Sequence, residues 1–399
     1  MSQITLNDQL ETLLSEDIAS VIERELTTFD KLVAPFSDVL VLFGAGNLGK
    51  KTLAGLRQVG IEPLAFADNN PALWGKKVDD LLVMSPADAA QKFNHKAAFI
   101  ITIAQGGSCW SIYDRQKQLE ALDCSRILSF GPLFWKYPDI FLPHHMVDLP
   151  HKIIQQADII NKGFSLWVDD ASRREYITQL RWQILMDIDD LPPPVVHDMY
   201  FPTDLLKIRA DETFIDCGAY DGDTIRVFLK NHANSFERIV AFEPDFKNAE
   251  KLRRYVLTLP GRLQDQIVIH PLSVGERRER VSFNSMGTMV SSVGSGKEFV
   301  DSVALDDALA NLKPTYIKMN IEGSELEALA GASRLIKENL PVLAICVYHR
   351  YDHLWRIPWV IHLIQNNYLF FLRPYFDKLW EILCYALPKN RVIHVATPE

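Results

Sequence analysis

The sequence predicts an α/β protein with two parallel-sheet domains that are separated by a helical, proline-rich segment. Apolar runs of strand length alternate with helical periodicity in two parts of the chain, which is typical of parallel sheets with right-handed crossovers. Each part has a glycine turn directly after its first apolar run. Between them, "LPPPVVHDMYFPTD" at 191–204 stops any helix. The predicted divisions are a packing helix at 1–36, an α/β domain at 37–150, a helical connection at 151–205 and a second α/β domain at 206–399.

Composition narrows the class of protein. The 399 residues suffice for two or three domains, and 48% hydrophobic with 23% charged residues is typical of globular chains. A net charge of −9 argues against a nucleic-acid partner, since such binding depends on clustered Lys and Arg. The five cysteines form no Cys-x-x-Cys pair, so we expect neither a zinc cage nor a disulfide framework. No run approaches the roughly 18 apolar residues of a membrane span, and a cytoplasmic protein is expected.

The first α/β part begins with a helix. Leucine, isoleucine and valine recur at three- and four-residue spacing over residues 5–33, the period of one packing helix. Apolar runs at 39–43, 63–67 and 97–103 are predicted strands, and residues 48–58 are a predicted helix.

The turn after the first of these strands reads "GAGNLG", with Gly44, Gly46 and Gly49 at the spacing of the dinucleotide fingerprint. Asp68 ends the next strand 22 residues after Gly46, where a ribose contact belongs. The continuation "AFADNNPALWGKKVDDLLVMSPADA" at 65–89 resembles the nucleotide-sugar-binding Rossmann domains of bacterial sugar-modifying enzymes. That resemblance implies that these four residues hold a nucleotide or nucleotide-sugar.

Two alternatives stay open for this first turn. One is an NAD(P)- or nucleotide-sugar-dependent oxidoreductase or epimerase that uses this glycine motif. The other is a non-catalytic module that binds a nucleotide, or an empty scaffold that mediates packing or homo-oligomer formation.

Strand and helix alternation resumes after residue 205. Seven apolar runs are predicted strands, at 213–216, 238–242, 266–270, 316–319, 341–347, 368–372 and 382–386. The chain therefore has enough strands for a second complete sheet.

The second glycine turn, "DCGAYDGDT" at 216–224, favours a different ligand. It lacks both Gly-x-Gly spacing and a Lys-Ser/Thr pair, and its carboxylates would repel a bare pyrophosphate. Glu243 ends the next strand 27 residues after Asp216, where a carboxylate can accept both ribose hydroxyls. Together these residues describe a site for S-adenosylmethionine, a nucleoside with cationic groups and no phosphate. The alternative is an acidic turn in which Asp223 or Thr224 is the helix N-cap.

The segment from about 200 to 375 resembles the FkbM family of S-adenosylmethionine-dependent methyltransferases. The resemblance is carried by five ordered blocks: "FIDCGAYDGDT" (214–224), "VAFEPD" (240–245), "HPLSVG" (270–275), "SVALDD" (302–307) and "YIKMNIEGSELEALAGA" (316–332). It implies the class I methyltransferase fold, so that both domains are Rossmann-like and the second has a seven-stranded sheet with a last antiparallel strand.

By this resemblance the turn surrounds the methionine part of the cofactor, Glu243 binds the ribose and Ser273 lies near the adenine. The implied cofactor-binding set is Asp216, Gly218, Ala219, Tyr220, Asp221, Gly222, Thr224, Glu243, Pro244, Ser273 and Asn320. Family members usually carry Lys-x-Asp-Ile/Val-Glu-Gly-x-Glu, whereas this chain has Asn320 in place of that Asp. An amide is a far weaker ligand than a carboxylate for a hard cation, so no metal is expected.

Methyl transfer to a hydroxyl needs collinear reacting atoms and a group that takes the proton. Glu322, Glu325, His349 and His353 follow the fourth and fifth predicted strands of the second domain, at the edge where open α/β sheets bind ligands. His349 and Glu322 are the predicted catalytic residues, although the two glutamates could instead stabilise a helix start. The expected acceptor is a small molecule or glycan, with a hydroxyl on a sugar or related metabolite as the methylated group.

Overall fold

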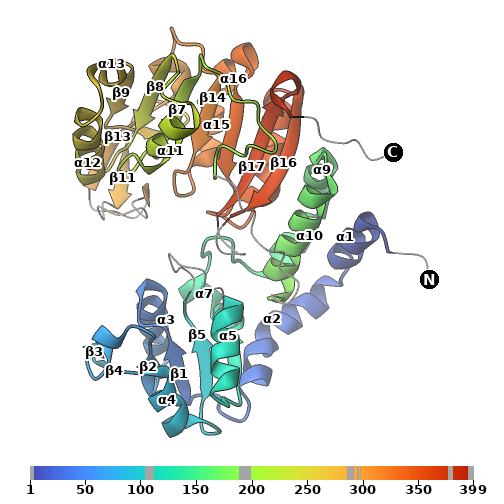
Figure 1. Cartoon of the computed structure of the whole chain (residues 1–399). Coiled ribbons are helices and arrows are strands. Elements are labelled where there is room, and N and C mark those ends of the chain that lie inside the picture. Colours follow the sequence, from blue (N-terminus) through green and yellow to red (C-terminus); the bar gives the residue numbers. More distant parts are fainter. Residues whose placement is uncertain are drawn as a thin grey trace. The chain divides into compact units, whose positions relative to one another are not determined.

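The computed structural model describes residues 4–103, 112–187, 199–284, 292–293, 296, 298–375 and 381–393 (Figure 1). The chain divides into two compact units. The first comprises Met1–Ala157, Ile177–Pro194 and Phe376–Trp380, and the second comprises Asp158–Tyr176, Val195–Tyr375 and Glu381–Glu399. Among the described residues, no helix is both long and apolar enough to cross a membrane.

The first unit is built on a six-stranded sheet with the order β3-β4-β2-β1-β5-β6. Its strands are β1 (Leu40–Phe43), β2 (Ala65–Ala67), β3 (Lys77–Val78), β4 (Leu81–Met84), β5 (Ala98–Ile101) and β6 (Ile127–Ser129). All pairs are parallel except β3 with β4. The neighbours of β1 are β2 on one side and β5 on the other, so the strand order reverses at β1, as in a Rossmann-like sheet.

The helices of this unit are α1 (Leu6–Leu14), α2 (Ile18–Val33), α3 (Asn47–Gln58), α4 (Pro86–Phe93), α5 (Ile112–Ala121), α6 (Gly131–Lys136), α7 (Pro138–Phe141) and α8 (Pro150–Ile154), with a 3-10 turn η1 (Pro71–Leu73). The single helix predicted over 5–33 is in fact two, because Asp17 caps a new helix by accepting a hydrogen bond from the Ser20 amide. The buried stripe of α2 also differs from the predicted one, since Ile22 and Leu26 are 38% and 58% exposed.

The second unit is built on a seven-stranded sheet with the order β16-β17-β15-β14-β7-β8-β9. Its strands are β7 (Thr213–Cys217), β8 (Arg238–Phe242), β9 (Ile267–His270), β14 (Tyr316–Met319), β15 (Val342–Cys346), β16 (Tyr368–Pro374) and β17 (Ile382–Pro388). The last strand, β17, is antiparallel to both β15 and β16, and the first five pair in parallel. The predicted fold class, with two Rossmann-like sheets, is confirmed.

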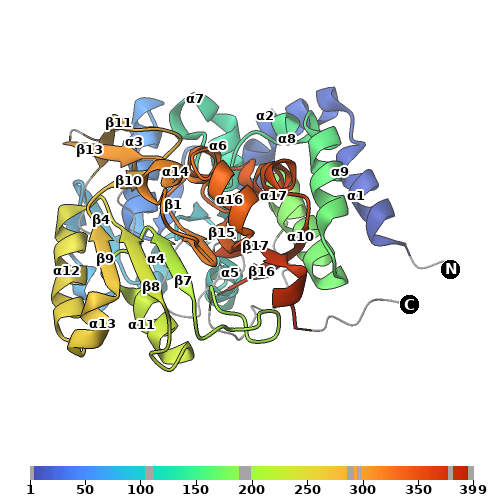
Figure 2. The ribbon, with the colours of Figure 1, turned by 90° about the horizontal axis from the view of Figure 1, so that it is seen from above.

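Helices and a small sheet complete the second unit (Figure 2). The helices are α9 (Ala157–Leu166), α10 (Asp170–Leu185, which continues into the first unit), α11 (Asp223–Asn231), α12 (Phe246–Leu257), α13 (Gly261–Asp265), α14 (Leu305–Ala308), α15 (Glu325–Ala330), α16 (Ser333–Asn339) and α17 (His353–Ile364), followed by η2 (Lys389–Arg391). The small sheet has the order β10-β13-β11-β12, from β10 (Ser273–Val274), β11 (Glu279–Asn284), β12 (Ser292–Val293) and β13 (Glu298–Val303).

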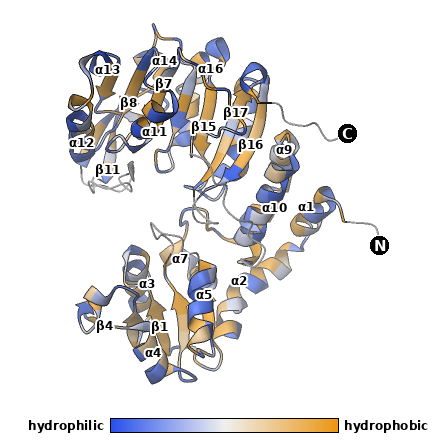
Figure 3. Ribbon diagram, viewed as in Figure 1, coloured by the Kyte–Doolittle hydropathy of each residue, from blue (hydrophilic) through white to orange (hydrophobic). Residues whose placement is uncertain are grey.

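Burial explains why the main strands read as continuous apolar runs. Every residue of β7, β14 and β15 is buried, and Figure 3 shows β15 as hydrophobic along its length. A parallel sheet covered on both faces requires this pattern rather than an alternation of polar and apolar residues. The polar residues that do occur in these strands, above all Asp216 and Lys318, therefore need partners.

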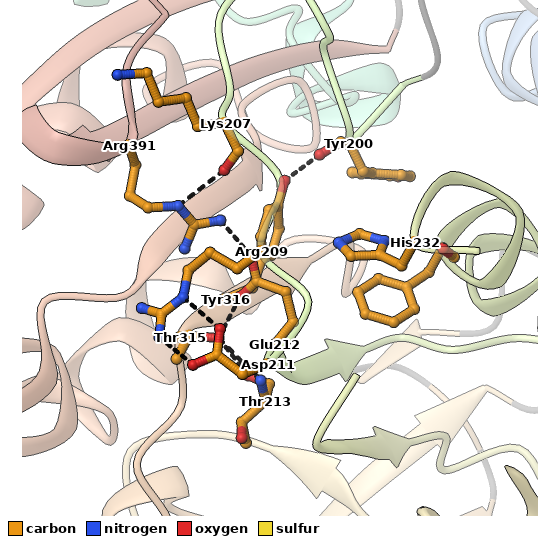
Figure 4. Close-up of polar contacts among 11 residues, drawn as sticks. Tyr200, Lys207, Arg209, Asp211, Glu212, Thr213, His232, Thr315, Tyr316 and Arg391 are labelled. Atoms are coloured by element: carbon orange, nitrogen blue, oxygen red, sulfur yellow. Dashed lines mark hydrogen bonds and ion pairs between the residues drawn. The ribbon is translucent and has the colours of Figure 1, made fainter. Parts of the chain in front are cut away.

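A buried polar cluster joins the amino ends of β7 and β14 to the chain beyond β17 (Figure 4). The carboxylate of Glu212, which has no exposed surface, accepts hydrogen bonds from the Arg391 guanidinium and the Thr315 hydroxyl. Arg391 Nε also donates to the Lys207 carbonyl at 3.0 Å. This cluster lies at the opposite end of β7 from the glycine turn, so it supports the sheet rather than a ligand site.

Candidate functional site

The glycine turn after β7 has a backbone that only glycine accommodates. Gly218 has φ +83°, and a Cβ added there would lie 2.0 Å from the carbonyl oxygen of Asn320. Gly222 has φ +90° and is the N-cap of α11. The loop therefore passes against the end of β14 at the point where the order of the parallel strands reverses, between β7 and β14. Since Gly222 occupies the N-cap position, neither Asp223 nor Thr224 is the helix cap.

Glu243 lies against this turn, as the strand spacing predicts. Its Oε2 accepts a hydrogen bond from the Tyr220 amide at 2.8 Å, and its Oε1 accepts one from the Asp245 amide at 2.9 Å. The side chain is almost fully buried, and burial raises the pKa of Glu243 to about 7 in spite of these two hydrogen bonds. The carboxylate is thus held in one orientation beside the turn, with lone pairs left for further donors.

Asp216 is brought to the same place but has a second role. It is the direct cross-strand partner of Lys318, whose Nζ lies 2.8 Å from Asp216 Oδ1 and donates to the Gly218 carbonyl at 2.7 Å. Burial alone would lower the pKa of Lys318, but the carboxylate of Asp216 outweighs it and raises that pKa. The second oxygen of Asp216, Oδ2, is buried and has no hydrogen-bond partner among the described residues.

The other predicted cofactor residues lie in different surroundings. Ala219 and Thr224 are buried in the turn and the first turn of α11, and the Ala219 amide donates to the Phe242 carbonyl. Asp221 instead turns to Arg226, with its Oδ1 2.8 Å from the guanidinium. Ser273 begins β10 in the small sheet, where its hydroxyl lies 3.5 Å from the Asp301 carbonyl. Pro244 continues the strand end at Glu243.

Asn320 has a partner that the sequence did not indicate. Its Nδ2 donates to the Tyr200 hydroxyl at 3.0 Å, while its buried Oδ1 has no partner among the described residues. Tyr200 is buried with φ +75°, its ring lies 5.2 Å from Lys318 Nζ, and its carbonyl accepts a hydrogen bond from the Tyr316 hydroxyl (Figure 4). Tyr200 and Lys318 are therefore two residues of this region that the sequence prediction missed.

A second polar cluster lies at the ends of β14 and β15. His349 Nδ1 lies 2.7 Å from Glu325 Oε1, and His349 Nε2 lies 3.6 Å from Glu322 Oε1. His353 Nδ1 lies 3.3 Å from the other oxygen of Glu325. The side chain of Glu322 is 18% exposed, whereas those of His349 and Glu325 are 1% and 0% exposed. All four residues that were predicted near the proton-transfer step are thus in one cluster.

Charge within this cluster is fixed by burial and pairing. Burial alone would lower the pKa of His349, but Glu325 and Glu322 outweigh it and raise the pKa to about 9. Burial alone would raise the pKa of Glu325, yet His349 and its hydrogen bond lower it to about 2. Burial raises the pKa of Glu322 and lowers that of His353 to about 4. These shifts favour a protonated His349 beside an ionised Glu325 at neutral pH, and a neutral His353.

In the first glycine turn, close packing explains two of the three glycines. A Cβ at Gly44 would lie 2.4 Å from the Ile103 side chain, and one at Gly49 would lie 1.9 Å from the Gly44 carbonyl, so packing explains both. A Cβ at Gly46 would meet nothing within 4 Å. Asp68 accepts a hydrogen bond from the Ala45 amide at 2.7 Å, which places its carboxylate beside the turn.

A groove of about 470 Å³ begins at Asn69, the residue after Asp68. It is lined by Asn69, Trp74, Ser85, Pro86, Ala87, Gln118, Ala121 and Leu122. Among the residues that the structure describes, no group of three or more His, Cys, Asp or Glu could hold a metal ion.

The second unit combines the antiparallel seventh strand, a glycine loop after its first strand and an acid after its second, which is the class I methyltransferase architecture. Residues 216–387 match the model of the methyltransferase FkbM domain. The match supports methyltransferase activity.

The structure is similar to that of the methyltransferase FkbM from Methylobacillus flagellatus KT, with a TM-score of 0.75 and 23% identity over 96% of this chain and 99% of that chain. At this identity the likeness shows the fold, and it covers both units. A putative rRNA-methylase from Clostridium thermocellum covers 48% of this chain and 91% of its own at 10% identity and a TM-score of 0.31, too low to support an argument. No curated protein matches the sequence.

Proposed function

We propose that the protein transfers a methyl group from S-adenosylmethionine to a hydroxyl of a sugar, glycan or related metabolite. The observation that carries the proposal is the bridge from Glu243 to the amides of Tyr220 and Asp245, which fixes a buried carboxylate beside the glycine turn. A carboxylate in this place suits two ribose hydroxyls. The buried, unpartnered Oδ2 of Asp216 fits a donor from the same ligand, such as its amino group.

The chain supplies position and charge for this reaction. The cofactor would provide a methyl group on a positively charged sulfur. The turn and Glu243 would hold the nucleoside, with Ser273 on the adenine side. Asp216 would keep Lys318 paired beneath the loop, where Lys318 also donates to the Gly218 carbonyl. Most of the rate enhancement would come from holding the acceptor oxygen in line with the methyl group.

The geometry favours Glu322 over His349 as the group that takes the acceptor's proton. Glu322 is the one acid of the second cluster with an exposed edge, and burial raises its pKa toward the range that a general base needs. His349 is almost wholly buried, and as a cation it cannot accept a proton. We therefore assign Glu322 as the proton acceptor and His349 as its fixed counter-ion.

Calorimetric titration with S-adenosylhomocysteine and with nicotinamide dinucleotides tests the cofactor assignment. We expect binding of the former, a loss of affinity in Glu243→Gln, and no change in Glu237→Gln. Glu237 is an exposed residue beside the other end of the same strand, so its variant removes a charge without touching the turn. Preference for a nicotinamide dinucleotide, or unchanged affinity in Glu243→Gln, would overturn the assignment. Mass spectrometry of a cell extract incubated with enzyme and labelled methyl donor would identify the acceptor.

We also infer a nucleotide-binding role for the first unit. Gly46 is the one glycine of the first turn at which a side chain would meet no neighbouring atoms, so packing does not explain it. The Asp68 carboxylate accepts a hydrogen bond from the neighbouring Ala45 amide, and Trp74, which lines the groove, donates to the Asp68 carbonyl. Gly46→Val fits the extended backbone at this residue, so it should keep the fold and abolish binding of a nucleotide-sugar. Failure of uridine and guanosine diphosphate sugars and of nicotinamide dinucleotides to bind the unaltered protein would favour the scaffold alternative.

A further inference from the structure

Glu325 lies at the centre of a buried hydrogen-bonded arrangement that the proposed chemistry does not by itself require. Its side chain has no exposed surface, and its Oε1 contacts both His349 Nδ1 at 2.7 Å and the Ile321 amide at 2.9 Å. The backbone segment that carries Glu322 is therefore tied to the same oxygen that orients His349. Moving Glu325 would displace both partners.

The backbone between these residues is bent in an unusual way. Glu322 has φ +54° and Gly323 has φ +104°, both in the left-handed region. A Cβ on Gly323 would lie 3.2 Å from Arg350 Nε and 3.9 Å from His349 Cβ, so the bend packs against the chain after β15. Left-handed conformations at residues other than glycine are costly and persist where the surroundings impose them. Here the bend sets Glu322 over the Nε2 edge of His349.

Several charged groups act on His349. Glu325 and Glu322 raise the pKa of His349, and Lys318 lowers it. From α17, His353 contacts Glu325, and the charges of Asp352 and Arg350, just before this helix, act on His353. Because His353 is neutral, the negative charge of Glu325 acts mainly on the protonated His349. A buried imidazole without such a carboxylate would lose its proton, since desolvation disfavours the charged form.

We propose that Glu325 is a positioning residue for methyl transfer, which holds His349 with Nδ1 toward itself and Nε2 toward Glu322. This inference rests on the proposed function. In the transfer, the acceptor O–H bond breaks as its oxygen bonds to the methyl carbon, and the electron pair of the carbon–sulfur bond stays on the sulfur. The proton passes to Glu322. His349 keeps both of its protons and stabilises the ionised Glu322 before the transfer. Glu325 orients His349, as the buried acid of a catalytic triad orients its histidine.

The test compares Glu325→Gln with Glu327→Gln. Glu327 lies on the same helix, α15, but is exposed, so its variant makes the same change in charge outside the cluster. Histidine signals in NMR spectra give the protonation state of His349 without any assay of activity. We expect His349 to carry protons on both nitrogens at pH 7 in the unaltered protein and in Glu327→Gln, and to titrate below pH 7 in Glu325→Gln.

Kinetics give the second readout. With the acceptor in hand, Glu325→Gln should lower kcat about 10- to 100-fold with KM changed less than about twofold, and it should shift the pH profile. Affinity for S-adenosylhomocysteine should stay the same, and Glu325→Asp should recover part of the rate. A neutral His349 in the unaltered protein, or an unchanged titration and pH profile in Glu325→Gln, would overturn the proposal. If no methyl acceptor or cofactor binding is found, the proposed function fails, whereas the NMR result still decides the role of Glu325. Should Glu325→Gln not fold, the state of His349 in the unaltered protein and in Glu325→Asp decides it.

Discussion

Affinity for the cofactor should depend on pH through one buried carboxylate. The pKa of Glu243 is raised to about 7 by burial, and the ribose hydroxyls of the proposed ligand would donate to its ionised form. Ligand binding and proton binding then compete for the same group. Lowering the pH below 7 should weaken binding, and raising it above 7 should have little further effect.

The size of the effect follows from this pKa. If only ionised Glu243 binds, the apparent Kd is multiplied by one plus ten to the power of the pKa minus the pH. The factor is about 2 at pH 7, about 11 at pH 6 and about 30 at pH 5.5, where each tenfold step corresponds to about 1.4 kcal/mol. By the same linkage, binding near pH 6 should release close to one proton, about 0.9 per ligand.

Isothermal titration calorimetry with S-adenosylhomocysteine measures both quantities. Titrations from pH 5.5 to 8 give the affinity, and buffers of different ionisation enthalpy give the proton release. Glu243→Gln should bind more weakly at high pH and show a flat profile. A Kd constant within twofold between pH 6 and 8 would refute the reasoning. A slope that persists in Glu243→Gln would assign the titration to another group, of which the buried Asp216 is the first candidate.

Two further predictions concern stability. Gly218→Ala should destabilise the fold by about 2 to 4 kcal/mol in chemical denaturation, since its φ is +83° and its Cβ would lie 2.0 Å from the Asn320 carbonyl. Gly46→Ala, with open space at its Cβ, should change the free energy of unfolding by less than about 1 kcal/mol. Equal losses in both variants would contradict the account of the two turns. Arg391→Met should lower the free energy of unfolding by about 3 to 5 kcal/mol, because it leaves the fully buried Glu212 without its cation. The double variant Glu212→Gln with Arg391→Met should recover at least half of that loss. A double variant no more stable than the single one would show that the ion pair is not the cause.

The sequence predicted the parts of the fold that depend on local periodicity and on strand-end chemistry. The predicted strands of the second domain were apolar runs. They could be predicted because strands buried on both faces of a sheet are mostly apolar. The break between α1 and α2 was missed, because leucine and isoleucine continue the helical period across Asp17 while a single capping hydrogen bond decides the boundary. Strands β3, β4 and β6 were also missed; unlike the fully buried β1, β2 and β5, they contain exposed or half-buried residues.

Site residues at strand ends could be predicted from the sequence. Residues that join the site through partners far apart in the sequence could not. Glu243 and the glycine turn were found from spacing along the sheet. Lys318 left a usable signal, since a lysine within the apolar run "YIKM" must find an acid, and the facing strand of the sheet carries Asp216. Tyr200 left none. It joins the region through contacts with Tyr316 and Asn320, more than a hundred residues away, and no local pattern encodes such a pairing.

Asn320 shows how one substitution connects these observations. An aspartate there would only accept hydrogen bonds when ionised, whereas the Asn320 amide donates to the Tyr200 hydroxyl and so ties the chain before β7 to the end of β14. An aspartate would also add a negative charge close to Asp216 and Glu322, which a divalent cation could offset. With an amide, Lys318 pairs with Asp216, and His349 lies beside both Glu325 and Glu322. Each of these carboxylates therefore has a side-chain cation beside it, and Asn320 adds no further negative charge, which is why we propose a reaction that depends on positioning and a protein base instead of a metal.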